Sequence, residues 1–389
     1  MTAADPLRFE GLPRPELGKM TIYVFGPGVG ESQVVALPDG RWIVVDTCEH
    51  DNVVLPRALL DHFEVRTVDL LIVSHPDRDH YKGLPRLLAG PEEGQPQPLD
   101  VKLLWRYRGS HARRHVLAKL CADDPSNQGR FAELREAEKA MERLGRGTTQ
   151  CEAALETEQW PSRAGANYEV TCIAPCQADQ TYETEQWVKL FKLSKNGLQL
   201  DDRVERFLRG KARGLDGKGN PLSLAIVIRW GSVGVLLGGD VEASSDVDRG
   251  WNGVLAALAK DWPKNLDLLR DLHVVKVSHH GSKGAFSEAA WRLHAEARPV
   301  DLAIVTPYQG GSNPPPHRET FRGLARFAAR VALTSEPSAW GKVTDAGWVR
   351  INAPTGPGKA ACVALTLDGT SPPEVWTSEQ GAVFAPLLL

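Results

Sequence analysis

The stretch Leu70–Leu84 reads LLIVSHPDRDHYKGL and decides the fold. It opens with the apolar run Leu70–Val73, whose polar boundaries predict a buried strand. Side chains that can bind a metal ion follow at once in one short loop, namely His75, Asp77, Asp79 and His80. Because Pro76 removes a backbone donor, it stiffens that turn. A strand end followed by a tight turn can aim alternate side chains at one point, so the stretch predicts a metal site there.

The residue types of this loop favour a metal over a plain surface turn. Imidazole nitrogens and carboxylate oxygens are the ligands of Zn²⁺ and of harder ions such as Mn²⁺. The other interpretation is a solvated polar loop with two incidental histidines. Two His and two Asp at the spacing H-x-D-x-D-H, directly after an apolar strand, favour the metal site.

This loop resembles the signature of the metallo-β-lactamase superfamily, whose usual form is H-x-H-x-D-H. Asp77 stands where the second His is usual, and this variant resembles the ComEC-type branch, the β-lactamase-like domain of DNA-uptake proteins. The resemblance implies an α+β fold, a metallo-β-lactamase-type αββα sandwich, with metals at the rim between two sheets. Asp77 makes the first metal site harder and more anionic, so Mn²⁺ becomes a candidate beside Zn²⁺.

Length and composition set the broad class. The chain has 389 residues, 42% of them apolar, and a net charge of −3, so any surface that attracts nucleic acid must be local. Its six cysteines are scattered, and we expect mostly reduced, buried thiols. The first twenty residues lack the apolar core of a signal peptide, and no run reaches the length of a membrane span. We therefore expect a cytoplasmic protein without a membrane partner.

The expected domain organisation is one hydrolase domain with additions. Residues 1–18 read as a polar leader and residues 19–352 as the metallo-β-lactamase-like hydrolase domain. Two insertions are expected within it, at about 100–165 and 180–218. Residues 353–389 are expected to hold C-terminal strands and a tail.

The segment before the metal loop predicts short strands that end at Asp46. Its order is strand, GxGES loop, strand, the turn Pro38-Asp39-Gly40, strand and Asp46. This order resembles the opening of the ComEC-type domain. The resemblance implies that Asp46 does not bind metal but hydrogen-bonds the metal loop and orients it. The alternative is an Asp that simply ends a strand.

A second carboxylate follows another pair of predicted strands. Two apolar runs joined at Trp230-Gly231 end at Gly238-Gly239-Asp240. This pattern resembles the ComEC-type L-x-G-D motif, in which the Asp bridges two metal ions, and the resemblance gives that role to Asp240. One carboxylate shared between two cations offsets their mutual repulsion. The alternative is that Asp240 caps a helix beginning near Val241.

Two adjacent histidines end the strand that starts near His273. They belong to the sequence His279-His280-Gly281-Ser282, which resembles the family's H-H-G-S. The resemblance implies that the strand-end His completes the second metal site, and we favour His279 as that ligand. His280 either binds too or faces the scissile group. Ser282 and Gly281 offer N–H donors for a phosphate oxygen.

The sequence departs from the family pattern after the predicted strand Ala166–Pro175. The family has a third His there, whereas this chain has Ala174-Pro175-Cys176. Three alternatives stay open: Cys176 substitutes, the first metal site is incomplete, or ligands come from elsewhere in the chain. A weakened first site would favour a single metal ion.

The candidate catalytic residues are Asp79, His280 and His317. Asp79 would orient the nucleophile or accept a proton from it. His317 follows the predicted strand Asp301–Pro307 and matches a family His that acts as a leaving-group proton donor or phosphate contact.

Both insertions are basic. The first has a cluster of Arg, His and aromatic residues that suits a phosphate backbone. The side chains proposed to bind substrate are Arg106, Arg108, Arg113 and Arg114. An exposed, salt-bridged helix pair is the alternative for this cluster. The second insertion, which is dense in Lys and Arg, is either a substrate clamp or a solvated loop.

Taken together, the sequence predicts a metal-dependent hydrolase. It would bind two divalent ions, Zn or Mn, or a single such ion. The resemblance implies a phosphodiesterase or nuclease that acts on DNA through a metal-activated hydroxide. A hydrolase of small cyclic nucleotides is an alternative with the same chemistry. A catalytically weakened metal-binding scaffold subunit of a multiprotein system is another. Hydrolysis of an acyl or thioester bond would call for an apolar approach surface, and the insertions are basic.

Overall fold

The protein is described by a computed structural model. The described residues are 9–89, 98–107, 125–146, 150–153, 158–160, 167–189, 191–194, 197–200, 220–260, 263–310, 314–335, 340–353, 355–356 and 361–386.

The first sheet has nine strands within the described residues, in the order β19-β21-β20-β1-β2-β3-β6-β7-β8. They are β1 (Met20–Phe25), β2 (Ser32–Ala36), β3 (Trp42–Val45), β6 (Thr67–Val73), β7 (Asp100–Arg106), β8 (Gln150–Ala153), β19 (Thr355–Gly356), β20 (Cys362–Leu367) and β21 (Glu374–Ser378). Strands β3, β6, β7 and β8 run parallel, so their carboxyl ends share one edge.

The second sheet also has nine described strands, in the order β18-β22-β17-β16-β15-β14-β13-β10-β9. They are β9 (Glu158–Trp160), β10 (Tyr168–Ala174), β13 (Ala225–Trp230), β14 (Val233–Leu237), β15 (Val274–Lys276), β16 (Leu302–Val305), β17 (Val331–Leu333), β18 (Trp348–Ile351) and β22 (Ala382–Pro386). Strands β14 to β17 are parallel, and their carboxyl ends lie at a common edge.

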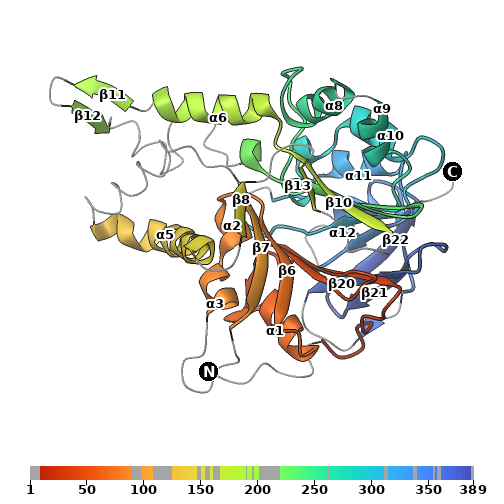
Figure 1. Cartoon of the computed structure of the whole chain (residues 1–389). Coiled ribbons are helices and arrows are strands. Elements are labelled where there is room, and N and C mark those ends of the chain that lie inside the picture. The colour runs from red at the N-terminus through yellow and green to blue at the C-terminus, as the bar shows by residue number, and fades with distance from the viewer. Residues whose placement is uncertain are drawn as a thin grey trace.

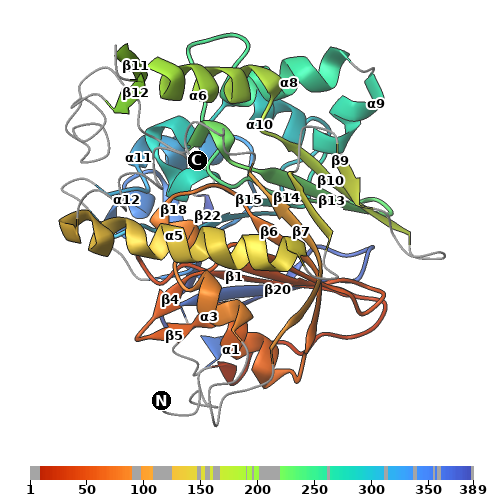
Figure 2. The ribbon, with the colours of Figure 1, turned by 60° about the vertical axis from the view of Figure 1, so that its left-hand side comes forward.

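Helices cover the outer face of each sheet, as Figure 2 shows. Against the first sheet pack α1 (Leu55–His62), α3 (Leu84–Leu88) and α5 (Pro125–Arg146). Against the second pack α8 (Gly250–Lys260), α10 (Glu288–His294), α11 (Arg318–Leu324) and α12 (Trp340–Thr344). The inner faces of the two sheets share a separate apolar core. The fold is therefore the expected α+β type, an αββα sandwich.

Shorter elements complete the described chain (Figure 1). They are α2 (Arg78–Tyr81), α6 (Gln177–Lys189), α9 (Pro263–Leu266), the ribbons β4–β5 (Glu49–His50, Val53–Val54) and β11–β12 (Phe191–Ser194, Gly197–Leu200), and the 3₁₀ segments η2 (Asn220–Leu222), η3 (Asp267–Leu269), η4 (His279–Gly281) and η5 (Lys283–Ala285). No helix in the described ranges combines the length and the apolar character needed to cross a bilayer.

The strands near the C-terminus are part of both sheets. Strand β20 pairs with β1, and β22 lies between β17 and β18. At the other end of the chain, Phe9 is buried and its ring packs edge-on against Phe25. Both ends of the described chain thus contribute to the apolar layers of the sandwich.

Candidate metal centre

The metal loop begins where β6 ends, at the rim between the two sheets. Its first residue, Ser74, is tied to the second sheet because its carbonyl oxygen accepts the N–H of Leu224 at 3.0 Å. Asp46 ends β3, the strand beside β6, and has a left-handed backbone with φ of 58°. One Asp46 oxygen accepts the Ser74 N–H at 2.7 Å, and the other lies 2.8 Å from His80 Nδ1. Asp46 therefore holds the loop and one of its imidazoles.

The buried carboxylate of Asp240 collects histidines from separate parts of the chain. His80 Nε2 lies 3.5 Å from Asp240 Oδ1, and His75 Nε2 lies 3.6 Å from Asp240 Oδ2. His279 Nε2 is 3.8 Å from the same Oδ2. Asp240 is fixed by its own backbone, because its N–H donates to Ser223 Oγ at 2.7 Å. The β14 end, the metal loop and the β15 end therefore meet at one carboxylate.

The two other acids of the loop lie beside different histidines. Asp79 Oδ2 lies 3.8 Å from His80 Nε2 and 3.1 Å from His280 Nε2. Asp77 Oδ2 lies 3.6 Å from His75 Nε2. We name the two groups by the Asp240 oxygen that lies near His80 or near His75. The Oδ1 group is His80, Asp79 and His280, and the Oδ2 group is His75, Asp77 and His279.

The histidine pair at the end of β15 supplies one ring to each group. His279 and His280 both have left-handed backbones, with φ of 44° and 52°. This conformation is costly for a residue with a Cβ and persists only where its surroundings enforce it. Here the His279 N–H donates to the Gly239 carbonyl at 2.9 Å, and His280 Nδ1 lies 2.9 Å from the Thr306 carbonyl. His280 Nε2 lies beside Asp79 and His279 Nε2 beside Asp240, and the ligand role of either ring stays a prediction.

The buried polar atoms of these groups fit a metal ion. His75 Nε2, His80 Nε2 and Asp240 Oδ1 are buried, and none has a hydrogen-bond partner among the described residues. Leaving such atoms unpaired costs free energy unless a further ligand satisfies them. Ligand atoms of these three residues lie within 4.8 Å of one another, as do those of Asp79, His80 and His280. The nitrogen and oxygen donors are those that Zn²⁺ and Mn²⁺ accept.

The histidines of the centre lower the pKa of the neighbouring carboxyl groups. Burial alone would raise the pKa of Asp240, but His80 and His75 lower it well below its ordinary value. Burial likewise opposes ionisation of Asp79, yet the neighbouring His80 and His280 lower the pKa of its carboxyl. Both carboxylates are therefore ionised at neutral pH, which is the form that binds cations.

A buried ion pair behind the centre was not singled out from the sequence. Glu31 and Lys276 are both fully buried, and the Lys276 ammonium donates to the Glu31 carboxylate. The second Glu31 oxygen accepts the Thr306 hydroxyl and lies 3.3 Å from His280 Nδ1. Burial would raise the pKa of Glu31, but Lys276 lowers it. The Glu of the GxGES loop and the Lys before the double His were the available signals.

Two further residues that hold His279 were also missed. Glu242 Oε1 lies 2.6 Å from His279 Nδ1, and Asn220 Nδ2 lies 3.2 Å from the same nitrogen. Glu242 and Asn220 also contact one another at 3.2 Å. They fix the ring so that its Nε2 faces Asp240. Asn220 is the first residue of η2, and Glu242 lies two residues beyond Asp240.

Cys176 lies apart from the metal-facing atoms. Its thiol donates to Asp179 Oδ2 at 3.1 Å, and it belongs to none of the described residue groups that could hold an ion. Cys48, Cys172, Cys176 and Cys362 are all buried and free of disulfides. His279, by contrast, lies near the same Asp240 oxygen as His75.

The other predicted site residues take varied places. His317 begins α11, and its N–H donates to the Gly281 carbonyl at 2.9 Å, next to the double His. The Ser282 N–H donates to the His279 carbonyl at 2.8 Å, and its hydroxyl lies 3.1 Å from His279 Nδ1. Arg106 ends β7 and lies 3.5 Å from Glu138 of α5. Arg108, Arg113 and Arg114 lie outside the described residues.

Comparison with known proteins gives matches among solved structures alone. No family model matches the chain, and no curated protein does. A diphosphatase of the PhnP family is 12% identical, with 80% of this chain and 93% of that one covered and a TM-score of 0.34. The metallo-β-lactamase fold protein YhfI from Bacillus subtilis is 11% identical, with 80% and 95% covered and a TM-score of 0.37. Yeast PDE1 is 12% identical, with 81% and 97% covered and a TM-score of 0.39. With TM-scores below 0.5, these likenesses carry no weight for the activity.

Proposed function

We propose that this protein is a metal-dependent hydrolase that cleaves phosphodiester bonds. The observation that carries the proposal is the pair of ligand groups on either side of Asp240, with buried His75, His80 and Asp240 atoms that lack other partners. Two adjacent groups of nitrogen and oxygen donors around one shared carboxylate suit two divalent ions.

The residues would share the ions in a defined way. The Oδ1 group would hold one ion and the Oδ2 group the other, with Asp240 between them. When bound, such ions lower the pKa of a coordinated water toward 7 and polarise the phosphoryl oxygen. In this assignment His279 is a histidine ligand of the Oδ2 group, and neither group includes Cys176. Zn²⁺ and Mn²⁺ both suit the mixed donors.

Other residues position the histidine ligands by contacting the ring nitrogen that does not face the metal site. Asp46 holds His80 through Nδ1, which presents Nε2 to Asp240. The carbonyl of Thr306 and the carboxylate of Glu31 hold His280 in the same manner. Such contacts fix ring orientation and raise the basicity of a metal-binding imidazole.

His317 is the proposed contact for the leaving oxygen. Burial lowers the pKa of His317, as do the nearby cations Lys342 and Lys283. The imidazole is therefore neutral around pH 7, and it would act as a proton donor only on the acid side of neutrality. Its backbone contact with Gly281 keeps it beside the double His.

The substrate favoured from the sequence is DNA, and small nucleotides are the second candidate. The described residues support metal-dependent hydrolysis, and both substrates stay candidates. Arg106 is engaged with Glu138, and the other three arginines of the cluster lie outside the described residues. The substrate test must therefore include both polymers and small diesters.

The decisive experiment measures metal and activity on the same preparations. Protein purified without added metal is analysed by mass spectrometry, loaded with Zn²⁺ or Mn²⁺, and assayed with bis(4-nitrophenyl) phosphate, linear and circular DNA, and a 2′,3′-cyclic nucleotide. We expect about two ions per chain and cleavage of the nitrophenyl diester. The exposed Asp345→Asn is the matched control for Asp79→Asn, which should lose cleavage. No bound metal and no cleavage with either ion would refute the hydrolase and favour a scaffold subunit.

A further inference from the structure

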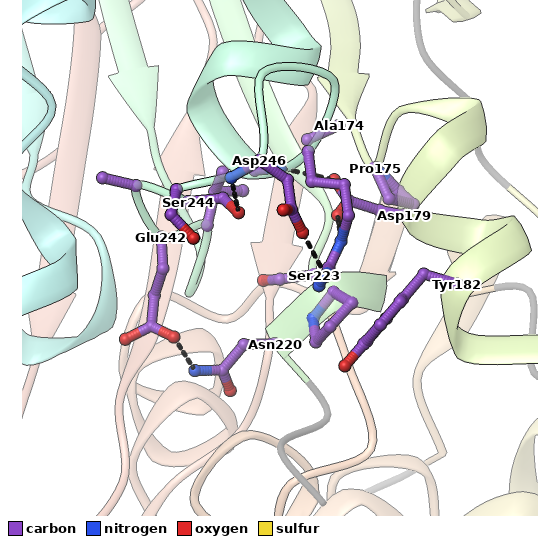
Figure 3. Close-up of a pocket in the computed structure, with 15 residues that line it drawn as sticks. Ala174, Pro175, Asp179, Tyr182, Asn220, Ser223, Glu242, Ser244 and Asp246 are labelled. Atoms are coloured by element: carbon purple, nitrogen blue, oxygen red, sulfur yellow. Dashed lines mark hydrogen bonds and ion pairs between the residues drawn. The ribbon is translucent and has the colours of Figure 1, made fainter. Parts of the chain in front are cut away.

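A cavity of about 450 Å³ lies beside the Oδ2 group, and Figure 3 shows its lining. This volume is within the range of small-molecule sites. Its walls come from the β10 end, α6, η2 and the segment that follows Asp240. We call it the side cavity.

The side cavity adjoins the metal centre through side chains that line it. Glu242 and Asn220 both line the cavity and both contact His279 Nδ1, at 2.6 and 3.2 Å. Ser223 lines it as well, and its hydroxyl accepts the N–H of Asp240. His279 and Glu242 are about one-fifth exposed, at 22% and 23%. A phosphate at the Oδ2 group would therefore have its substituent within reach of the cavity.

The departure from the family pattern coincides with this space. Ala174 and Pro175, which stand where a third His was expected, are both part of the cavity lining. Figure 3 shows Pro175 and Asp179 on one side of the cavity, with Glu242 across from them. A small side chain and a proline fill less volume than an imidazole pointed at the metals. The lost ligand thus leaves room for part of a substrate.

The charges of the cavity disfavour a second phosphate. Its lining has three carboxylates, from Asp179, Glu242 and Asp246, and one described cation, Arg249. Arg249 is already engaged, because Nε lies 3.4 Å from Asp179 and Nη1 donates to Asp246 at 3.0 Å. Its guanidinium also stacks on the Tyr182 ring, 3.4 Å from the centroid. A second anionic group in the cavity would meet like charges that the lining does not offset.

The polar atoms of the lining suit hydroxyl groups. Ser244, Ser245 and Tyr182 contribute hydroxyls, which donate and accept, while the carboxylates only accept. An alcohol also does both, so it can pair with either kind of partner.

We propose that the side cavity binds an uncharged, hydroxyl-rich substituent of the phosphodiester, such as a sugar or polyol. This assignment rests on the proposed hydrolase function and narrows it. It favours a small diester with one phosphate and a sugar-like group over a polynucleotide. The neighbouring phosphates of a polynucleotide would have to enter the cavity or pass along its edge.

Binding to the metal-loaded protein tests the assignment without relying on turnover. Calorimetric affinities are compared for methyl phosphate, ribose 5-phosphate, ribose 1,5-bisphosphate and phosphoethanolamine. We expect ribose 5-phosphate to bind at least about tenfold more tightly than methyl phosphate, since each neutral hydrogen bond contributes about three- to tenfold. The bisphosphate should bind more weakly than ribose 5-phosphate. Equal affinities for methyl phosphate and ribose 5-phosphate would overturn the proposal.

Variants then link the preference to the cavity. Ser244→Ala and Tyr182→Phe should each reduce the ratio of ribose 5-phosphate to methyl phosphate affinity by about three- to tenfold. The matched control is Ser232→Ala, because Ser232 lies at an exposed turn with its hydroxyl 3.4 Å from Gly369. An unchanged ratio in both cavity variants would place sugar recognition elsewhere.

Three outcomes keep the assignment separate from the hydrolase proposal. If phosphoethanolamine binds more tightly than ribose 5-phosphate, the acidic lining serves a cation and the hydroxyl assignment is wrong. If bis(4-nitrophenyl) phosphate is cleaved but the sugar preference is absent, the hydrolase stands and the cavity assignment fails. If neither cleavage nor phosphate binding occurs with any ion, the hydrolase itself fails.

Discussion

The two sides of Asp240 differ in how exposed their ligands are. On the Oδ1 side, His80 and His280 are buried, and each is fixed by a carboxylate or a carbonyl behind it. On the Oδ2 side, Asp77 is 37% exposed and His279 is 22% exposed. The Oδ2 side also borders the side cavity and lacks the third His of the related pattern. For the proposed hydrolase, we therefore expect the ion on the Oδ1 side to be held more tightly and the ion on the Oδ2 side to be more accessible to a substrate.

The largest effect should come from the carboxylate that both sides share. Asp240→Asn keeps the shape but removes the charge, so both ions lose a ligand at once. We expect metal content to fall toward zero and activity to fall by about 10³-fold or more, because several kcal/mol of charge stabilisation is lost. Mass spectrometry and the nitrophenyl diester assay measure both. Retention of one tightly bound ion would show that the two sides do not depend on Asp240 equally.

The adjacent histidines separate the two sides directly. His280→Ala should remove the tightly held ion, whereas His279→Ala should remove the weakly held one and leave about one ion per chain. Each variant serves as the control for the other, since both stand in the same loop. Titration with Zn²⁺ in the presence of a competing chelator distinguishes the two sites. Identical losses in the two variants would contradict the division of the ligands between the two oxygens.

A smaller effect is expected from the residue that holds His80. Asp46→Asn retains a hydrogen-bonding group but not the charge beside His80 Nδ1. Loss of such a partner costs about 10- to 100-fold in metal affinity. Asp39→Asn is the matched control, because Asp39 pairs with Arg41 in the turn before β3, at the other end of that strand. The chelator titration should show no change for the control, and a change there would point to a general loss of stability.

The smallest effect on metal content is expected for substitution of His294, a buried histidine outside the metal centre. Burial lowers the pKa of His294 to about 4, and its Nδ1 is 3.0 Å from the Leu269 carbonyl. A folded pKa below the unfolded value of about 6.5 means that unfolding takes up a proton in acid. Stability should therefore fall by up to about 3 kcal/mol as the pH drops from about 6.5 to about 4.

Substitution of His294 tests that assignment. His294→Gln should flatten the acid limb of a plot of unfolding free energy against pH, while the bound metal stays unchanged. Chemical denaturation at several pH values provides the measurement. A matching loss of metal would mean that α10 and the rim are coupled more strongly than their separation in the sandwich indicates.

Much of the fold could be read from the order of apolar runs. The strands ending at Asp46, His75, Asp240 and His279 were each predicted from a buried run followed by polar residues, and the structure has a strand before each. The αββα sandwich itself came from the resemblance of those motifs. The C-terminal strands were harder to place, because β20 and β22 pair with partners far away in sequence.

The sequence by itself determined which residues follow strands, and therefore which side chains reach the rim. The spacing of these residues is a local property of the sequence. It sets which side chains follow a strand end, whatever the rest of the chain does. Only the tertiary structure decided which histidine nitrogen faces which oxygen of Asp240. It also decided that Glu31, Lys276 and Glu242 lie beside the ligands. These contacts join segments up to 275 residues apart, so they depend on how the two sheets pack rather than on any local pattern. The side cavity has the same origin, because its walls meet only when β10, α6 and the segment after β14 come together.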